Sequence, residues 1–303
     1  METCRQHGVP AALERSRSGQ GAHVWIFFSA SVLAATARRM GCFLLTETMS
    51  RRHELSMASY DRLFPNQDTM PQGGFGNLIA LPLQQGPRKE GNSLFLDEHL
   101  EPFKDQWAFL GSLRRMAPDE VEALAETASR QGRVLGVRFE GLDDGFDATP
   151  WERPPSGKAK HPLIEGPVPP RVEAVSAQAI FIEKAGLPSA LLTEIKRLAA
   201  FQNPEFYKKQ AMRFSTAGTP RIICAAEEHP LHLALPRGCL DAVNELLTQH
   251  GSALPLQDQR LTGSPLSLNF QGQLTEIQTK AAEAIEGHDL GVFVAPPGTG
   301  KTV

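Results

Sequence analysis

The order of hydrophobic and polar positions predicts a strand followed by a helix near the start of the chain. Residues 23–28 form a β-branched and aromatic run, which is typical of a strand buried on both faces. From Ser31 to Arg51 the apolar spacing becomes helical, and the same period turns Arg38 and Arg39 away from the apolar face. The residues expected on that face are Leu33, Ala37, Met40 and Leu44.

The same reasoning predicts helices and strands in mixed order along the rest of the chain. Gly8 is expected to end a short helix, and residues 9–13 lead into a strand. Further strands are expected at 77–83, 93–96, 220–226, 231–235 and 291–294. Further helices are expected at 104–115, 118–131, 188–201, 240–250 and 273–286.

A change of composition divides the chain. Residues 140–172 are rich in aspartate and proline, which is typical of a linker. We therefore expect a first domain at 1–139, this linker, a small α/β segment at 173–262 and the start of another domain at 263–303. No internal repeats are found.

Composition adds one local feature. The 303 residues carry a net charge of −3, so the whole chain is not strongly basic. Residues 1–62, however, contain eight arginines and no lysine, against five acidic residues. Arginine favours forked contacts with phosphate, although a solvated surface explains such residues equally well.

The cysteines and the longest apolar stretch bear on the compartment. Cys4, Cys42, Cys224 and Cys239 are scattered and predict neither a disulfide framework nor a zinc site. The apolar stretch at 25–37 is too short to span a bilayer. We expect a cytoplasmic protein without a membrane partner.

The last residues of the sequence fit a phosphate-binding loop. The apolar run 291–294 leads into Ala295–Thr302, which follows the pattern G-x-x-x-x-G-K-[ST] except that alanine replaces the first glycine. In such a loop Lys301 neutralises the β and γ phosphates, and the hydroxyl of Thr302 is a ligand of Mg²⁺. The alternative is a Pro/Gly-rich turn with a solvated lysine. The residues expected to bind ATP are Gly298, Thr299, Gly300, Lys301 and Thr302.

A second glycine turn precedes the aromatic strand. Glycines at 19 and 21 allow close approach of the backbone to an anion, Ser18 offers a hydroxyl, and His23 could bond a phosphate oxygen. The alternative is a glycine turn in a β-hairpin with a satisfied histidine.

These residues, in this order, resemble the archaeo-eukaryotic primase superfamily. The resemblance is strongest to the primase domain of bacterial TOTE conflict systems, and it depends most on residues 59–68 and 73–77 (SYDRLFPNQD and GGFGN). The proteins that carry this domain look like fusions of a primase-polymerase domain with a superfamily 2 helicase. The resemblance implies nucleotide binding by Ser18, Gly19, Gly21, His23, Arg62 and Asn66.

The resemblance also implies catalytic roles for His23 and Asp61, with Asp61 as a metal ligand. The alternative for Asp61 is a turn-capping aspartate. Three sequence motifs of the family would bring Ser18, His23 and Asp61 together on one face of a sheet. Gln278 stands where such helicases place an adenine-reading glutamine, although a helix-surface glutamine is the alternative.

One departure from the family is serious. The family holds two divalent metals with a D-x-D pair upstream of the histidine, and this sequence has only Glu2 and Glu14 before His23. We therefore expect a fragment truncated at both ends. Its parent would use Mg²⁺ or Mn²⁺ and ATP, and neither would be stably bound by the fragment.

The sequence thus predicts an α/β chain. It would contain an incomplete primase-type α+β domain on an RRM-like sheet, a small α/β segment, and the start of a RecA-like P-loop domain. The expected function is nucleotide and DNA (or RNA) binding within a primase-polymerase and helicase fusion of a bacterial conflict system. The alternative is a non-catalytic nucleic-acid-binding module attached to a P-loop ATPase. Neither enzyme activity nor oligomeric state follows from the sequence.

Overall fold

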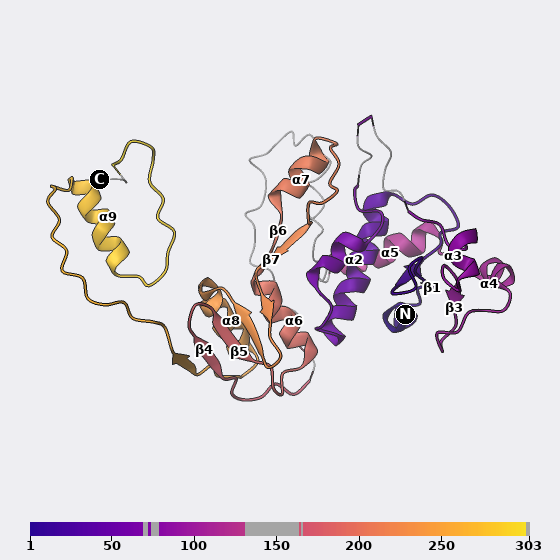
Figure 1. Cartoon of the computed structure of the whole chain (residues 1–303), viewed down its shortest axis with the longest axis horizontal. Helices are drawn as coiled ribbons and strands as arrows, with labels where there is room; N and C mark the ends of the chain where they lie inside the picture. Colours follow the sequence, from indigo (N-terminus) through magenta and orange to yellow (C-terminus); the bar gives the residue numbers. More distant parts are fainter. Residues whose placement is uncertain (69–71, 74–78, 131–163, 165, 301–303) are drawn as a thin grey trace.

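The computed structural model describes residues 1–68, 72–73, 79–130, 164 and 166–300, and it has the α/β class predicted from sequence (Figure 1). The elements before the proline-rich segment are α1 Glu2–Gln6, β1 Ala12–Arg15, β2 Ala22–Trp25, α2 Ala34–Arg51, the 3₁₀ helix η1 Met57–Arg62, α3 Gln85–Lys89, β3 Phe95–Leu96, α4 Gln106–Ser112 and α5 Pro118–Arg130. Those after it are β4 Ala174–Ser176, β5 Ile180–Glu183, α6 Ser189–Leu198, β6 Ala200–Gln202, α7 Pro204–Ala211, β7 Ile222–Cys224, β8 Glu227–Glu228, β9 His232–Leu235, the 3₁₀ helix η3 Arg237–Cys239, α8 Leu240–Gln249, β10 Leu256–Asp258 and α9 Glu276–Glu286.

The N-terminal sheet has three antiparallel strands in the order β2-β1-β3. In this register Glu14, on the central strand β1, lies opposite both His23 and Phe95. The expectation that residues 23–28 form a strand buried on both faces is wrong. The strand β2 ends at Trp25 and has β1 as its only strand neighbour among the described residues, so that Val24 is 51 % exposed.

Helix α2 is covered on two opposite faces. One face, with Met40, Phe43 and Leu44, packs with residues of α1 and α5 and with the two side chains after β2, Ile26 and Phe28. The opposite face, with Cys42 and Met49, packs against η1 and β7. Helix α2 therefore lies between the β1–β2 hairpin and the η1 region.

Two expectations about this helix are corrected. Arg38 does not point into solvent: it is 1 % exposed, because the η1 region and residues of the second part cover its side of α2. Leu33 is 78 % exposed, because α2 begins only at Ala34.

Two predicted strands are not found in the described residues. Residues 79–83 pair with no strand, and residues 77 and 78 lie outside the described residues. Residues 291–294 are likewise unpaired, and Val292 is 91 % exposed. A short apolar run fits a buried strand only where neighbouring strands exist to pair with it.

The second sheet has five strands in the order β10-β4-β5-β9-β8, with α6 and α8 packed against it. From β5 onward, leaving out residues 200–224, the elements follow the order β-α-β-β-α-β of a split β-α-β fold, with β4 added between β5 and β10. This RRM-like order was expected in the first domain. Among the described residues it is found at 174–258.

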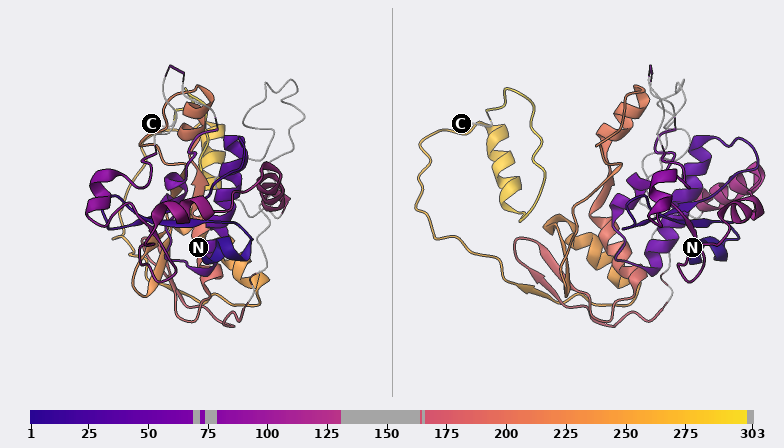
Figure 2. Two further views of the ribbon diagram at one scale, coloured as in Figure 1. Left: turned by 90° about the vertical axis from the view of Figure 1, so that its right-hand side faces the viewer. Right: turned by 45° about the vertical axis from the view of Figure 1, so that its right-hand side comes forward.

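Residues 200–224 leave this pattern between α6 and β8. They form a two-stranded antiparallel ribbon, β6 with β7, that carries α7 at its far end (Figures 1 and 2). We call residues 200–224 the excursion. The residues on either side of the excursion are hydrogen-bonded to each other: the backbone N–H of Ala225 donates to the carbonyl of Ala199 at 2.8 Å.

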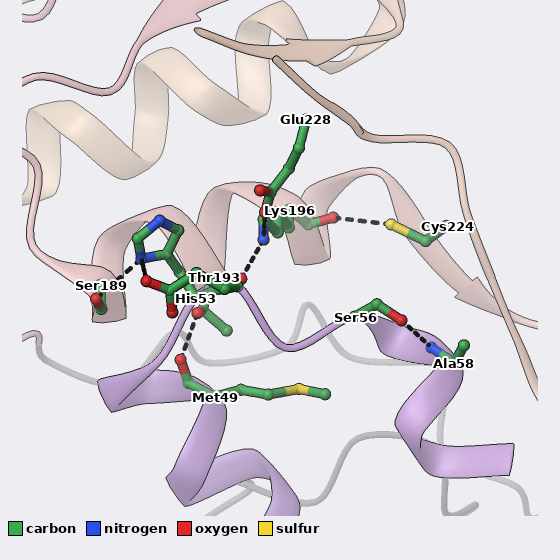
Figure 3. Close-up of polar contacts among 10 residues, drawn as sticks. Met49, His53, Ser56, Ala58, Ser189, Thr193, Lys196, Cys224 and Glu228 are labelled. Atoms are coloured by element: carbon green, nitrogen blue, oxygen red, sulfur yellow. Dashed lines mark hydrogen bonds and ion pairs between the residues drawn. The ribbon is translucent and has the colours of Figure 1, made fainter. Parts of the chain in front are cut away.

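Contacts between α6 and the end of α2 join the two parts of the chain (Figure 3). The Thr193 hydroxyl donates to the carbonyl of Met49 at 2.7 Å, and His53 Nδ1 lies 3.0 Å from the Ser189 hydroxyl. The Lys196 ammonium donates to the carbonyl of His53 and pairs with Glu228. Burial lowers the pKa of Lys196, so these acceptors compensate a partly desolvated charge.

Helix α9 follows a long extended segment and has no buried residue. Among the described helices, none has both the length and the apolar character needed to cross a membrane.

Candidate functional site

The β1–β2 hairpin holds four of the predicted site residues together: Ser18, Gly19, Gly21 and His23. Its turn is closed by the N–H of Ser16 donating to the carbonyl of Gly21 at 2.8 Å, and by Gly19 donating back to Ser16 at 3.0 Å. Gly19 has φ +76°, and a Cβ there would stand 2.6 Å from Asn92 Oδ1. The left-handed backbone therefore favours glycine at this position, and any other residue would also displace the Asn92 side chain.

His23 is held by a buried carboxylate. Its Nδ1 lies 3.2 Å from Oε2 of Glu14, directly across the ladder, while the His23 side chain is 51 % exposed and that of Glu14 only 3 %. Because Nδ1 faces Glu14, Nε2 is the ring nitrogen that a ligand can reach.

Glu14 receives two further donors. The Trp25 indole N–H donates to Oε2 at 2.6 Å, and the Ser93 hydroxyl donates to Oε1 at 2.8 Å. Ser93 has φ +55°, a left-handed conformation that is costly for a residue with a Cβ. Buried carboxylates need such donors, because an unpaired buried charge costs several kcal/mol.

Basic side chains surround the hairpin. Arg15 on β1 donates to the carbonyls of Gly91 and Leu100. Arg17 in the turn is exposed, as are Arg88 and Lys89 at the end of α3, the helix that leads to the Asn92 contact with Gly19. A turn with this charge favours an anionic ligand.

The other predicted primase residues lie in and after η1. One carboxylate oxygen of Asp61 accepts the backbone N–H of Arg221 at 2.7 Å. Burial raises the pKa of Asp61, and its contacts with Arg221 oppose that shift. Arg62 is exposed, and the carbonyl of Asn66 accepts from the Arg221 guanidinium.

The structure does not bring Asp61 to the hairpin. Ile26 and Phe28, which continue from β2, pack on one face of α2, whereas Tyr60, next to Asp61, packs on the opposite face. The expected convergence of Ser18, His23 and Asp61 is therefore not found, because α2 separates the first two from the third.

Around Asp61 the structure shows a buried polar contact that the sequence did not indicate. Arg38 and Asp68 form an ion pair with side chains 1 % and 3 % exposed, and Gln210 of α7 donates to Asp68 at 2.9 Å. The Arg221 guanidinium lies 4.2 Å from the centre of the Phe206 ring. Through these contacts the excursion binds the η1 region.

The described residues do not fit a two-metal centre. No group of three or more His, Cys, Asp or Glu side chains among them could hold a metal ion. Asp61, the predicted metal ligand, instead accepts a backbone N–H. We therefore derive no step through Mg²⁺ or Mn²⁺.

The predicted ATP-binding loop is described as far as Gly300, and Lys301 and Thr302 lie outside the described residues. Gly298 and Gly300 have φ +83° and +73°, as a tight loop requires. The Thr299 hydroxyl donates to the carbonyl of Pro296 at 2.9 Å.

Gln278 links this loop to α9. Its side-chain oxygen accepts the N–H of Thr275, which completes a capping box at the start of α9. Its amide nitrogen donates to the carbonyls of Thr299 and Gly300 at 3.1 and 3.4 Å. The structure thus brings Gln278 and the loop together.

Sequence reasoning missed Glu14 as a partner of His23. A signal was present, since a turn centred between residues 18 and 19 places Glu14 opposite His23 on the same face. Ser93 had no comparable signal, because its contact depends on β3 pairing and on an unusual backbone conformation.

Residues 1–124 match the family model described as "TOTE conflict system, Archaeo-Eukaryotic Primase domain". The match spans the hairpin, α2 and η1 and covers less than half of the chain. It confirms the primase-domain part of the predicted resemblance. No curated protein matches the chain.

Proposed function

We propose that the β1–β2 hairpin binds the phosphates of a nucleoside triphosphate, as part of a primase-polymerase that acts on DNA or RNA. The observation that carries this proposal is the exposed ring of His23, held by Glu14 beside a Ser-Gly turn with basic neighbours. The match of residues 1–124 to a primase domain supports a nucleotide as the ligand of this turn.

The residues can bind phosphate in complementary ways. Nε2 of His23, when protonated, can donate to one phosphate oxygen, and the hydroxyl of Ser18 can donate to another. Arg17, Arg88 and Lys89 provide positive potential that raises the local concentration of an anion. Arg62 and Asn66, on the other side of α2, are proposed to contact nucleotide or template rather than the same phosphates.

We further propose that Gln278, Gly298, Thr299, Gly300, Lys301 and Thr302 bind ATP in an ATP-driven helicase joined to the primase domain. Two features support this: the positive φ of Gly298 and Gly300, and the two hydrogen bonds from Gln278 to the loop. When ATP binds such a loop, Mg²⁺ neutralises the phosphates and Thr302 would be its protein ligand.

A non-catalytic nucleic-acid-binding module is the second candidate. It is favoured by the absence of a metal-binding group among the described residues and by the use of Asp61 in a contact with the Arg221 backbone. In that case the arginines of residues 1–62 would bind phosphates without chemistry.

Titration of GTP into the full chain by calorimetry tests the first proposal. We use the Lys301→Ala background, so that the P-loop contributes no binding. His23→Ala should weaken binding about tenfold or more, since a charge-assisted hydrogen bond contributes about 1.5–3 kcal/mol. His99→Ala is the matched control, because His99 is exposed elsewhere in the same domain and should leave affinity unchanged.

Two results would contradict the proposal. GTP binding could be absent in the Lys301→Ala chain, or it could be equally strong with His23→Ala. Binding of labelled single-stranded DNA without any GTP binding would favour the second candidate.

A further inference from the structure

We infer that Glu14 is a positioning residue for the nucleotide site: it holds the His23 ring so that Nε2 faces the phosphates. This role rests on the proposed function of the hairpin. It assigns a task to a carboxylate that would otherwise be an unexplained buried charge in a strand.

The first argument is the way in which Glu14 is surrounded. Its side chain is 3 % exposed, and donors from three positions reach its two oxygens: His23 and Trp25 at Oε2, and Ser93 at Oε1. A carboxylate with both oxygens hydrogen-bonded has one orientation. The ring that it contacts is therefore restrained too.

The second argument is independent and comes from the backbone. Ser93 is 2 % exposed and adopts φ +55°, where a residue with a side chain is strained. Its N–H donates to the carbonyl of Arg15 at 3.0 Å, and its carbonyl accepts from Leu83 at 2.9 Å. These bonds fix the strained residue so that its hydroxyl meets Glu14.

The chemistry of the pair follows from these contacts. Nδ1–H of His23 donates to the carboxylate, which settles the tautomer of the neutral ring and directs Nε2 away from the sheet. When Nε2 is also protonated, its N–H can donate to a phosphate oxygen while the carboxylate balances the charge on the ring. Loss of Glu14 would leave Nε2 free to turn away from the ligand.

The variant Glu14→Gln tests this role with two measurements on the full chain in the Lys301→Ala background. The first is the ¹⁵N–¹H signal of His23 Nδ1–H, which needs no nucleotide and should shift upfield and weaken when a neutral amide replaces the charged acceptor. The second is GTP affinity by calorimetry, which should fall about tenfold. Glu122→Gln removes the same charge from an exposed position on α5, a helix with no role in the proposed site, and should change neither measurement.

Ser93→Ala provides a second route if Glu14→Gln does not fold. It removes one donor to Glu14 without touching His23, so it should broaden or shift the Nδ1–H signal and weaken GTP binding by a smaller factor. Circular dichroism checks that each variant is folded.

The outcomes separate the two proposals. If the Lys301→Ala chain with Glu14 intact does not bind GTP, the proposed function is overturned. A loss of binding in His23→Ala together with unchanged affinity in Glu14→Gln overturns the positioning role alone. An Nδ1–H signal that keeps the chemical shift of the unsubstituted chain in Glu14→Gln also overturns that role, because it would show that the carboxylate was not the acceptor.

Discussion

The carboxylate of Asp61 accepts the backbone N–H of Arg221 at 2.7 Å, although the two residues are 160 positions apart. The contact joins η1 to the start of β7. The Arg221 side chain then returns to the same region, where it donates to the carbonyl of Asn66 and lies over Phe206. Asp61 therefore has a structural task in the described fold, whatever further role it serves.

Substitutions at Asp61 should separate the loss of the acceptor from the loss of the charge. Asp61→Ala leaves the partly buried N–H of Arg221 without its acceptor and should lower the free energy of unfolding by about 1–3 kcal/mol. Asp61→Asn keeps an oxygen there and should cost less. Urea denaturation at pH 7 measures both; equal losses would contradict the prediction.

The stability contributed by Asp61 should also depend on pH. Its pKa in the folded state is raised above the ordinary value of 3.8, mainly by burial. The folded state therefore binds this proton more tightly than the unfolded state, which stabilises the fold at low pH. That contribution is lost as pH rises through the raised pKa.

The free energy of unfolding, measured by urea titration from pH 3 to pH 6, checks this sign. With rising pH, the unsubstituted chain should lose stability relative to Asp61→Asn. The opposite slope would mean that the Asp61 pKa is depressed, as expected for a carboxylate that serves as a metal ligand.

Replacing the buried arginine of α2, Arg38, should greatly lower the free energy of unfolding. Arg38→Met leaves the Asp68 carboxylate buried without its cation and should cost about 3–5 kcal/mol of stability. Adding Asp68→Asn should recover part of this loss, because a neutral amide can still accept from Gln210. Arg62→Met, at an exposed arginine, should stay within about 0.5 kcal/mol. Thermal unfolding of the three variants gives the comparison, and an Arg38→Met loss as small as the control would refute it.

Substitutions of Ser93 should reverse the usual order of alanine and glycine. Both remove the hydroxyl that donates to Glu14, which should cost about 1.5–3 kcal/mol. Glycine, however, adopts φ +55° without strain, so Ser93→Gly should be about 1 kcal/mol more stable than Ser93→Ala. At Ser176 in β4 the order should be the ordinary one, with alanine more stable than glycine. Chemical denaturation of the four variants decides, and the same order at both positions would argue against strain at Ser93.

Gln278→Glu should detach the predicted ATP-binding loop while leaving α9 intact. Glutamate can still accept the N–H of Thr275, but it cannot donate to Thr299 and Gly300. The amide signals of residues 298–300 should then shift and sharpen in NMR spectra, whereas Gln273→Glu should leave them in place. Unchanged loop signals in Gln278→Glu would show that these bonds do not hold the loop.

Much of the element order could be predicted from sequence, because long amphipathic segments such as α5, α6 and α8 carry a strong periodic signal. The three-residue strands β4, β6 and β10 were missed, since so few residues cannot display a period, and the strand β5 and the helix α7 were not predicted either. Arg38 was placed in solvent for a different reason. A helical period identifies one apolar face, whereas α2 is covered on two, and one of its covers comes from the excursion far along the chain.

The candidate site was predicted where its residues are neighbours in sequence. Ser18 and His23 lie on one hairpin, and a local pattern found them. Glu14 joins the site through strand pairing, which the centre of the turn could have indicated, whereas Ser93 joins it through a left-handed backbone that no local motif indicates. Asp61 was assigned to the same site by resemblance alone, and the packing of α2 separates it.

The hydrogen bond between Ala199 and Ala225 holds the two ends of the excursion side by side. Because it begins and ends at neighbouring positions, its length and surface can change without altering the threading of the five-stranded sheet. A change in its surface would alter what the η1 region contacts, whereas the contacts between α6 and α2 would remain.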